Sequence, residues 1–283
     1  QVELVTRSGW TSRYMLPDLS RLSQKPRSSL KSGRETSDGV YCLDRNTALV
    51  PCDASVVLKR RALPALPGEF DEAAMFMANR VRQDKFMGNL VPRKQCTFGD
   101  VQYKAYELWK DKSEWPGLVH RVLYATQAFA AMLGVPHPEE YTGVHANFYP
   151  DGDASVQKHS DDEAQLVDGA PIFSFTYLAD DSPQLARDFT IWKMTRGADQ
   201  IEGSGRLANV TLFSGDLLVM QGNMQKFFLH SIEKQKGKPL APRLNFTVRK
   251  FVPKESLRGK KRSATNTAPD VVVPPAAQTP PAR

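Results

Sequence analysis

The chain has 283 residues, of which 41% are hydrophobic and 24% are charged, and its formal net charge at pH 7 is +7. It is long enough to bury one substantial core or two small ones. No stretch approaches the roughly 20 consecutive apolar residues that a membrane-spanning helix needs, so we expect no membrane partner. The positive charge is compatible with nucleic-acid binding but does not require it.

The three cysteines, Cys42, Cys52 and Cys96, are odd in number and fit no zinc-binding spacing. They indicate free thiols in a reducing compartment. The start of the chain lacks a charged segment followed by an apolar one, so we expect an intracellular protein, nuclear or cytoplasmic and not secreted. Because residue 1 is Gln and not Met, we also expect a fragment or a processed product. We expect a monomer.

Residues 1–60 are rich in Ser, Arg and Lys, and their apolar residues follow no period. This composition predicts a basic, disordered arm. Such an arm is ordinarily a solvated leader, and a contact with nucleic acid is the alternative.

Two segments then have helical periodicity, with apolar residues three and four positions apart. Residues 69–84 carry acids in the first turn, and residues 117–134 are followed by a glycine, Gly134, that suits a helix C-terminus. The positions expected in the core are Phe70, Ala74, Met77, Val81, Leu118, Val122, Ala125, Phe129 and Met132.

After Gly143 the chain changes to short apolar or alternating runs separated by turn residues, including GVHANFYP, APIFSFTYLA, GDLLVMQ and RLNFTVRKF. These runs predict many short strands, and residues 196–209 predict a glycine-rich hairpin. Helices followed by strands indicate an α+β fold in which helices buttress one face of a β-sandwich or jelly roll. We predict a folded domain over residues 61–252, with the jelly roll at about 140–252.

From Pro253 onward, Pro, Ala and Thr predict a flexible tail over residues 253–283. A short basic cluster within it could serve as a nuclear address; its members are Arg258, Lys260, Lys261 and Arg262.

The stretch QKHSDDE at 157–163 places His159 two residues before Asp161. Alone it is most simply a polar loop. His230 follows a strand-like run downstream, and two imidazoles with one carboxylate are the set that holds non-haem Fe(II) with coordination positions left open. Two ligands two residues apart on a strand point to the same side, and a distant strand must supply the third.

The segment RLNFTVR alternates polar and apolar residues, so that Arg243, Asn245, Thr247 and Arg249 share one strand face. A face this polar is ordinarily exposed to solvent. In company with the two histidines and the aspartate, however, it predicts a site for an organic acid, because arginine offers a fixed fork for a carboxylate.

Together, HSD, the distant His230 and RLNFTVR resemble the AlkB family of Fe(II)- and 2-oxoglutarate-dependent dioxygenases, whose last motif is Arg-x-Asn-x-Thr-x-Arg. The stretch NFYPDGDASVQKHSDDE is similar to that family's Asn-x-Tyr segment. The resemblance covers roughly residues 86–251 and implies a double-stranded β-helix (jelly roll) with N-terminal helices.

The resemblance implies that Fe(II) is held by His159, Asp161 and His230 and that O2 and 2-oxoglutarate are co-substrates. It assigns Arg243 to the distal carboxylate of 2-oxoglutarate and Arg249 to the end near the metal. The remaining contacts to that molecule are implied for Asn147, Tyr149 and Asn245, whereas Thr247 is expected in the pocket wall.

The stretch VPRKQCTFGD (91–100) resembles the recognition lid, here about residues 85–116, of the AlkB homologues that repair duplex DNA. The resemblance implies that Arg93 and Lys94 lie near phosphates or the opposite strand. Phe86 or Met87 would be the wedge that fills the space of an extruded base. The alternative is that both side chains cap the preceding helix against the core.

A flipped base needs a stacking partner, for which Tyr103 and Tyr106 are candidates, with the ring of His159 as the opposite wall. Asp162 and Glu163 match the acidic pair of the DNA-repairing subgroup, and a carboxylate suits bases that are cationic when methylated. The alternative is that one acid binds a backbone amide and positions the metal loop.

The resemblance therefore implies oxidative demethylation of bases such as 1-methyladenine and 3-methylcytosine, with release of formaldehyde and succinate. DNA is favoured over RNA as the partner. The alternatives are demethylation of RNA or single strands, a protein- or lipid-directed oxygenase, and a silent nucleic-acid-binding module.

Overall fold

The computed structural model describes residues 2–5, 11–14, 34–35, 38–43, 54–86, 88–196, 201–238 and 240–253. Gln1–Phe251 form one compact unit, and Val252–Arg283 form a second, of which only Val252 and Pro253 are described. The described helices are α1 (Glu69–Arg80), η2 (Lys112–Glu114), α2 (Gly117–Met132), η3 (Pro138–Glu140) and α3 (Met224–Phe227).

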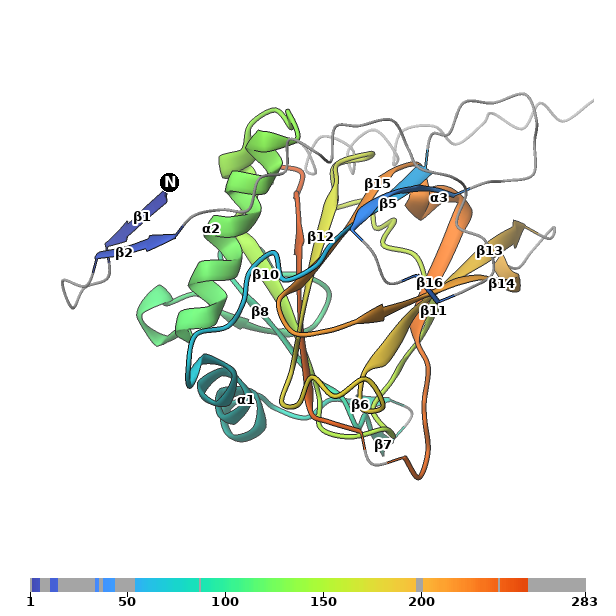
Figure 1. Ribbon diagram of the computed structural model, residues 1–283, viewed down its shortest axis with the longest axis horizontal. Helices are drawn as coiled ribbons and strands as arrows, with labels where there is room; N and C mark the ends of the chain where they lie inside the picture. The colour runs from blue at the N-terminus through green and yellow to red at the C-terminus, as the bar shows by residue number, and fades with distance from the viewer. Residues whose placement is uncertain are drawn as a thin grey trace, which may run out of the picture. The chain divides into compact units, whose positions relative to one another are not determined.

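Two sheets carry the fold (Figure 1). The larger has the order β4 (Gly39–Cys42), β5 (Ala54–Lys59), β15 (Asp216–Gly222), β12 (Ile172–Leu178), β17 (Arg243–Arg249), β10 (Gly143–Tyr149), β8 (Lys94–Phe98) and β9 (Glu107–Trp109). The smaller has the order β11 (Val156–His159), β16 (Phe228–Ile232), β13 (Arg187–Arg196), β14 (Ile201–Leu212) and β3 (Arg34–Glu35). Two short pairs are separate, β1 (Val2–Val5) with β2 (Thr11–Tyr14) and β6 (Lys85–Phe86) with β7 (Asn89–Leu90). The predicted α+β jelly roll is confirmed.

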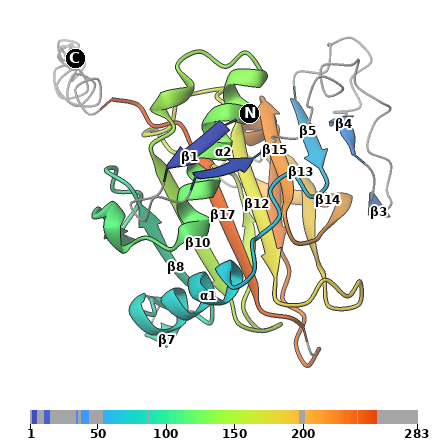
Figure 2. The ribbon, with the colours of Figure 1, turned by 60° about the vertical axis from the view of Figure 1, so that its left-hand side comes forward.

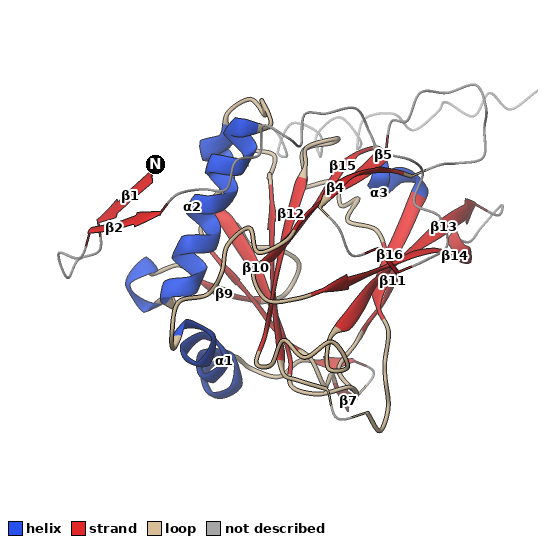
Figure 3. Ribbon diagram, viewed as in Figure 1, coloured by secondary structure: helices blue, strands red, loops and turns tan. Residues whose placement is uncertain are grey.

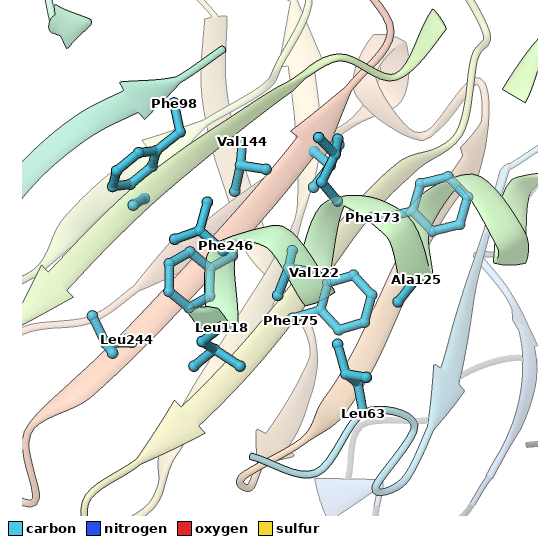
Figure 4. Close-up of a cluster of buried hydrophobic side chains, with 14 of the residues drawn as sticks. Leu63, Phe98, Leu118, Val122, Ala125, Val144, Phe173, Phe175, Leu244 and Phe246 are labelled. Atoms are coloured by element: carbon cyan, nitrogen blue, oxygen red, sulfur yellow. The ribbon is translucent and has the colours of Figure 1, made fainter. Parts of the chain in front are cut away.

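The outer face of the larger sheet is covered by α1 and α2, which Figures 2 and 3 show on the same side of its strands. Strand alternation supplies the apolar surface for them: Leu244, Phe246 and Val248 of β17 are at most 1% exposed and pack in one cluster with α2. Figure 4 shows Leu244 and Phe246 beside Leu118 and Val122 of α2. Burial of each such side chain contributes roughly 1.5–3 kcal/mol.

A second apolar cluster lies between the two sheets, because the inner faces of β5 and β15 meet those of β13 and β14. Val56 and Leu218 come from the larger sheet, and Phe189 and Val210 come from the smaller one. The inner faces of β10, β12 and β17 are instead mainly polar, although they are buried. This polar interior adjoins the second cluster.

Both predicted helices are present. α1 ends at Arg80, four residues before the predicted end, because Val81 is extended, at φ −85° and ψ 128°. Met77 and Val81 are buried as predicted, whereas Phe70 and Ala74 are half-buried.

In α2, the four predicted core positions from Leu118 to Phe129 are buried. The prediction for Met132 is wrong, because it is 46% exposed and Leu133 and Val135 pack against the core in its place. The predicted glycine cap is confirmed: Gly134 has φ +72°, and its N–H donates to Ala131 while that of Val135 donates to Ala130. This pair of bonds is a Schellman motif.

The predicted disordered arm over residues 1–60 is wrong for residues 39–42 and 54–59. β5 pairs with β15 and β4 pairs with β5, and Val56, Val57 and Leu58 are at most 2% exposed. Three consecutive apolar residues are the pattern of a strand that is covered on both faces. The average composition of the first sixty residues concealed this short run.

Residues 254–283, with the basic cluster at 258–262, lie outside the described residues, as do Cys52 and the side chain of Cys42. Cys96 is a buried free thiol, as expected. The strands β13 and β14 form the predicted hairpin. Within the described part of the chain, no helix has the length and apolar character needed to cross a membrane.

Candidate active site

One histidine–aspartate–histidine cluster lies at the junction of β11 and β16. His159 is the last residue of β11, and it is the register partner of His230 in the middle of β16. Their ring centroids are 4.2 Å apart. The Nε2 atoms of His159 and His230 lie 4.0 Å and 3.9 Å from the two carboxylate oxygens of Asp161, and all three ligand atoms lie within 4.8 Å of one another. This donor set and this spacing could hold a divalent metal ion.

The orientation of both rings suits metal binding. Nδ1 of His159 lies 2.8 Å from the carbonyl oxygen of Gln157, and an Nδ1–H donated there leaves the lone pair of Nε2 directed at Asp161. The ring of His230 stacks on Phe189 at 5.1 Å. Burial lowers the pKa of His159, and burial together with His159 lowers the pKa of His230 to about 3. Both imidazoles are therefore neutral near pH 7, as a ligand must be.

The carboxylate is held in its charged form. Burial opposes the ionisation of Asp161, but the Arg249 guanidinium and the two histidines outweigh it, so the pKa of this carboxyl lies well below its usual value. Arg249 Nη2 donates to Asp161 Oδ2 at 2.7 Å, and the backbone N–H of Asp161 donates to Gln225 Oε1 at 2.9 Å. The backbone amide of Asp161 is thus bound by Gln225, and not by Asp162 or Glu163.

The cluster opens into a cavity of about 250 Å³ between the two sheets. The walls include the inward positions of β10 and β17 and the lid segment after β8. All five residues predicted for the co-substrate line this one cavity: Asn147, Tyr149, Arg243, Asn245 and Arg249. The face of β17 that could have been exposed to solvent is buried, since Arg243 is 1% exposed.

One end of the cavity is cationic. The guanidinium carbons of Arg243 and Arg93 lie 5.0 Å and 5.8 Å from the ring centroid of Tyr149. Burial opposes ionisation of the Tyr149 hydroxyl, but these two arginines lower its pKa. Arg243 Nη2 donates to Thr176 Oγ1 at 3.0 Å. Its buried Nε and Nη1 have no hydrogen-bond partner within the described residues.

Further buried polar atoms on this wall also lack partners there, namely Asn147 Oδ1 and the Nε and Nη1 atoms of Arg249. Because an unpaired buried donor is costly, two arginines with free N–H groups fit a carboxylate ligand. Asn245 is held by hydrogen bonds to Ser174 Oγ and the Phe175 carbonyl, at 2.8 Å and 2.9 Å. Thr247 donates to Asn245 Oδ1 at 3.1 Å, in keeping with its expected place in the wall.

The lid brings two tyrosines to the cavity. Tyr103 is 1% exposed, and its hydroxyl donates to Glu163 at 3.0 Å. The ring of Tyr106 is half-buried and stacks on His145 at a centroid distance of 4.8 Å and an interplanar angle of 26°. Glu163 also forms an ion pair with Lys104. The lid is therefore tied to the metal loop through Tyr103 and Glu163.

Of the other predicted substrate residues, Arg93 lines the cavity, whereas Lys94, Asp162, Phe86 and Met87 are not among its lining residues. Lys94 donates to the carbonyls of Ala78 and Val81 at the end of α1, at 2.5 Å and 3.1 Å. It therefore caps a helix, and nothing places it in the cavity. Asp162 is exposed. Met87 and the side chain of Phe86 lie outside the described residues.

Sequence reasoning missed several residues of the cavity wall, among them His145, Ser174 and Lys104. The sequence could have indicated His145, because residues 145, 147 and 149 of a strand share one face and Asn147 and Tyr149 were already predicted to line the site. It also missed that Arg93 enters the cavity, where Nη2 donates to Gln95 Oε1 at 2.9 Å. Only the pairing of β8 with β10 reveals that position.

Comparison with known proteins supports these observations. Residues 58–249 match the model of the 2OG-Fe(II) oxygenase superfamily. Three curated proteins named DNA oxidative demethylase ALKBH2 are similar to 71% of the chain. The mouse (Mus musculus) protein is 26% identical to this chain, and the match covers 80% of its length. The bovine (Bos taurus) and human (Homo sapiens) proteins are each 29% identical, and the match covers 69% and 73% of their lengths.

The superfamily match extends over more than half of the chain, from β5 to the last residue of β17. It includes both histidines and the aspartate of the cluster and the cationic wall of the cavity. The chain therefore belongs to the 2OG-Fe(II) oxygenase superfamily, as an AlkB-like dioxygenase that depends on Fe(II), 2-oxoglutarate and O2.

Proposed function

We propose that this dioxygenase demethylates N-alkylated bases such as 1-methyladenine and 3-methylcytosine in DNA, and so acts in DNA repair. One observation carries the proposal: a two-histidine, one-carboxylate cluster shares a buried cavity with an arginine-lined wall. The three relatives named DNA oxidative demethylase support DNA as the substrate.

We assign Fe(II) to His159, Asp161 and His230, because both imidazoles are neutral and the carboxylate is charged. When bound, Fe(II) with 2-oxoglutarate and O2 supplies the oxidation of the methyl C–H bond, from which succinate, carbon dioxide and formaldehyde are the end products. The residues around the cluster hold its geometry. Arg249 fixes one oxygen of Asp161, and the Gln157 carbonyl fixes the ring of His159.

For 2-oxoglutarate, we assign the distal carboxylate to Arg243, whose Nε and Nη1 are unpaired among the described residues. Arg93, like Arg243, lies close to the ring of Tyr149, and we assign it to this end of the co-substrate and not to a phosphate. Asn147, Tyr149 and Asn245 line the wall between Arg243 and the metal cluster and would orient the molecule. Arg249 would contact the end near the metal.

On the substrate side, we propose the ring of His159 as one wall for the flipped base. The two candidate tyrosines both pack on His145, Tyr106 on its face and Tyr103 on its edge, so we assign them to the lid that holds this side of the cavity. Glu163 is bound by Tyr103 and Lys104, so we give it a positioning role. Asp162 is exposed and is the acid that remains available to a cationic base.

Mass spectrometry tests the proposal directly. Oligonucleotides carrying 1-methyladenine or 3-methylcytosine, as single-stranded DNA, duplex DNA and RNA, are incubated with Fe(II), ascorbate and 2-oxoglutarate. We expect methylated DNA to lose about 14 Da, the mass of one CH2 unit, and one succinate to form for each methyl group removed. Turnover of a methylated peptide but of no nucleic acid would instead assign the enzyme to protein substrates. Turnover of RNA alone would reject the DNA assignment.

The wedge and the oligomeric state are part of the same proposal. If Phe86 or Met87 fills the space of the extruded base, its replacement by Ala should reduce activity on duplex DNA more than on single strands. Equal losses on both would remove the wedge. A monomer is expected at every protein concentration in sedimentation experiments, with and without DNA.

A further inference from the structure

His145 is a buried polar side chain in the cavity wall without a role in the assignments above. It lies in the middle of β10, it is 7% exposed, and its Nδ1 atom is buried without a hydrogen-bond partner. The other two histidines of the cavity, His159 and His230, belong to the metal cluster, so His145 is the cavity histidine that has no ligand assigned to it. A buried atom such as this Nδ1 in a ligand cavity points to a ligand.

The ring is held in place by apolar contacts. Tyr106 stacks on one face at 4.8 Å, and Tyr103 meets the ring edge-on at 5.3 Å with an interplanar angle of 72°. Both tyrosines belong to the lid. The two tyrosines therefore fix the ring of His145 beside the substrate end of the cavity. Its contacts with them use the ring face and edge, and its buried Nδ1 remains for a ligand.

The position relative to the metal cluster follows from the strand register. His145 is opposite Thr247 on β17, so Arg249 is its diagonal neighbour on the same face. Arg249 in turn contacts Asp161. Burial, followed by the charges of Arg249 and Arg93, lowers the pKa of His145 well below its usual value. The imidazole is therefore neutral and offers one N–H donor and one acceptor.

We propose that His145 is a specificity-determining residue that donates a hydrogen bond from its ring N–H to the flipped base. The inference rests on the proposed function and deepens it. The nearby carboxylates of Asp161 and Glu163 can only accept hydrogen bonds when ionised. His145 adds a neutral donor, and a donor favours a base with a carbonyl group beside the methylated nitrogen.

This criterion separates the two candidate substrates. In 3-methylcytosine the methylated N3 is flanked by the C2 carbonyl and the C4 amino group. In 1-methyladenine the methylated N1 is flanked by C2–H and the C6 amino group. Only the pyrimidine has an acceptor for the His145 N–H next to the reacting methyl group, so His145 should favour 3-methylcytosine and other N3-methylated pyrimidines.

The test compares the wild-type enzyme with His145→Phe, which keeps the aromatic stack and removes the donor, and with His145→Gln, which restores an N–H. The quantity measured is the ratio of kcat/KM for 3-methylcytosine to that for 1-methyladenine in the same oligonucleotide. We expect the ratio to fall about tenfold in His145→Phe, because one buried hydrogen bond is lost, and to recover in His145→Gln. The KM for 2-oxoglutarate should not change. His120→Phe is the matched control, since His120 lies on α2 outside the cavity.

A second measurement needs no variant: the wild-type enzyme should lose a similar factor on 3-methyl-2-thiocytosine, in which sulfur, a weaker acceptor, replaces the C2 oxygen. An unchanged ratio in His145→Phe, or full activity on the thio base, would overturn the inference. A change in the KM for 2-oxoglutarate with an unchanged ratio would also overturn it, because it would move His145 to the co-substrate. If the wild-type enzyme processes neither methylated base, the proposed function itself fails.

Discussion

At the scale of single residues, the site depends on hydrogen bonds that the sequence does not reveal. Arg249 belongs to the last motif, yet it contacts Asp161 at 2.7 Å and so reaches the loop that follows β11. The backbone carbonyl of Gln157, a group that every residue type carries, holds Nδ1 of His159. These supporting contacts decide which nitrogen faces the metal position and keep the carboxylate charged.

Replacement of His159 by Ala removes one of the three proposed ligands, and we expect no detectable succinate formation. Mn²⁺ affinity, measured by electron paramagnetic resonance without any turnover, should fall by at least about 100-fold, because supporting residues alone are worth 10–100-fold. His120→Ala, on α2 and outside the cavity, is the control. Normal Mn²⁺ affinity in His159→Ala would mean that His159 is not a ligand.

Replacement of Arg243 by Ala should raise the KM for 2-oxoglutarate by about 10–100-fold, because charge-assisted hydrogen bonds contribute about 1.5–3 kcal/mol. Arg93→Ala should raise the KM for 2-oxoglutarate by less, because its contact with the co-substrate is expected to be weaker. The affinity for duplex DNA, measured by fluorescence anisotropy, should stay within about twofold of the wild-type value, because we assign Arg93 no phosphate contact. If Arg93→Ala instead weakens duplex binding at an unchanged KM, the phosphate role implied by the resemblance is correct for Arg93.

At the scale of elements, β17 shows how one strand serves two purposes. Its even-numbered residues pack under α2, and its odd-numbered residues line the cavity. The alternation was predictable because its period is two. The burial of the polar face was not, because a polar strand face is exposed unless a second sheet covers it. Here β11, β13 and β16 provide that cover.

Two neighbouring residues of β17 should therefore respond differently to truncation. Phe246→Ala removes a ring from the core under α2 and should lower the free energy of unfolding by about 3–5 kcal/mol. Asn245→Ala should lower it less and raise the KM for 2-oxoglutarate. Urea unfolding and steady-state kinetics of both variants provide the comparison. A stability loss without a kinetic effect in Asn245→Ala would remove this residue from the co-substrate site.

The end of α2 is a second element-scale device. Gly134 has φ +72°, and a Cβ added there meets no atom within 4 Å, so only backbone strain opposes a side chain. Gly134→Ala should destabilise the protein by about 1–2 kcal/mol, the cost of a left-handed conformation for an L-residue. Gly134→Asn should cost less, since Asn tolerates this region. Equal thermal stability of Gly134→Ala and the unaltered protein would contradict this account.

At the scale of the whole molecule, the first strands are integral to the larger sheet. β5 covers β15, and Arg60 next to it forms an ion pair with the buried Asp216. Because the inner and outer apolar clusters both include residues of β5, such as Val56 and Val57, it contributes to both cores. The boundary of the folded unit therefore lies before residue 60.

Deletion of residues 1–60 should prevent folding, because the buried side chains that are lost include Val56, Val57 and Leu58. Each is worth roughly 1.5–3 kcal/mol, against a total stability of about 5–15 kcal/mol. The deletion would also leave β15 with an unpaired edge. Deletion of residues 1–33 keeps β3, β4 and β5 and should leave a cooperative thermal transition. A folded, active chain after the longer deletion would show that β4 and β5 are dispensable.

The sequence by itself determined the helices, most of the strands, and the residue types of the metal cluster and of the polar face of β17, because these depend on local periodicity and spacing. The tertiary structure decided what depends on long-range pairing: the register that places His159 opposite His230, the entry of Arg93 and His145 into the cavity, and the incorporation of β5 into the sheet. The physical reason is that strand periodicity fixes which side chains share a face, but the pairing of distant strands decides what that face meets.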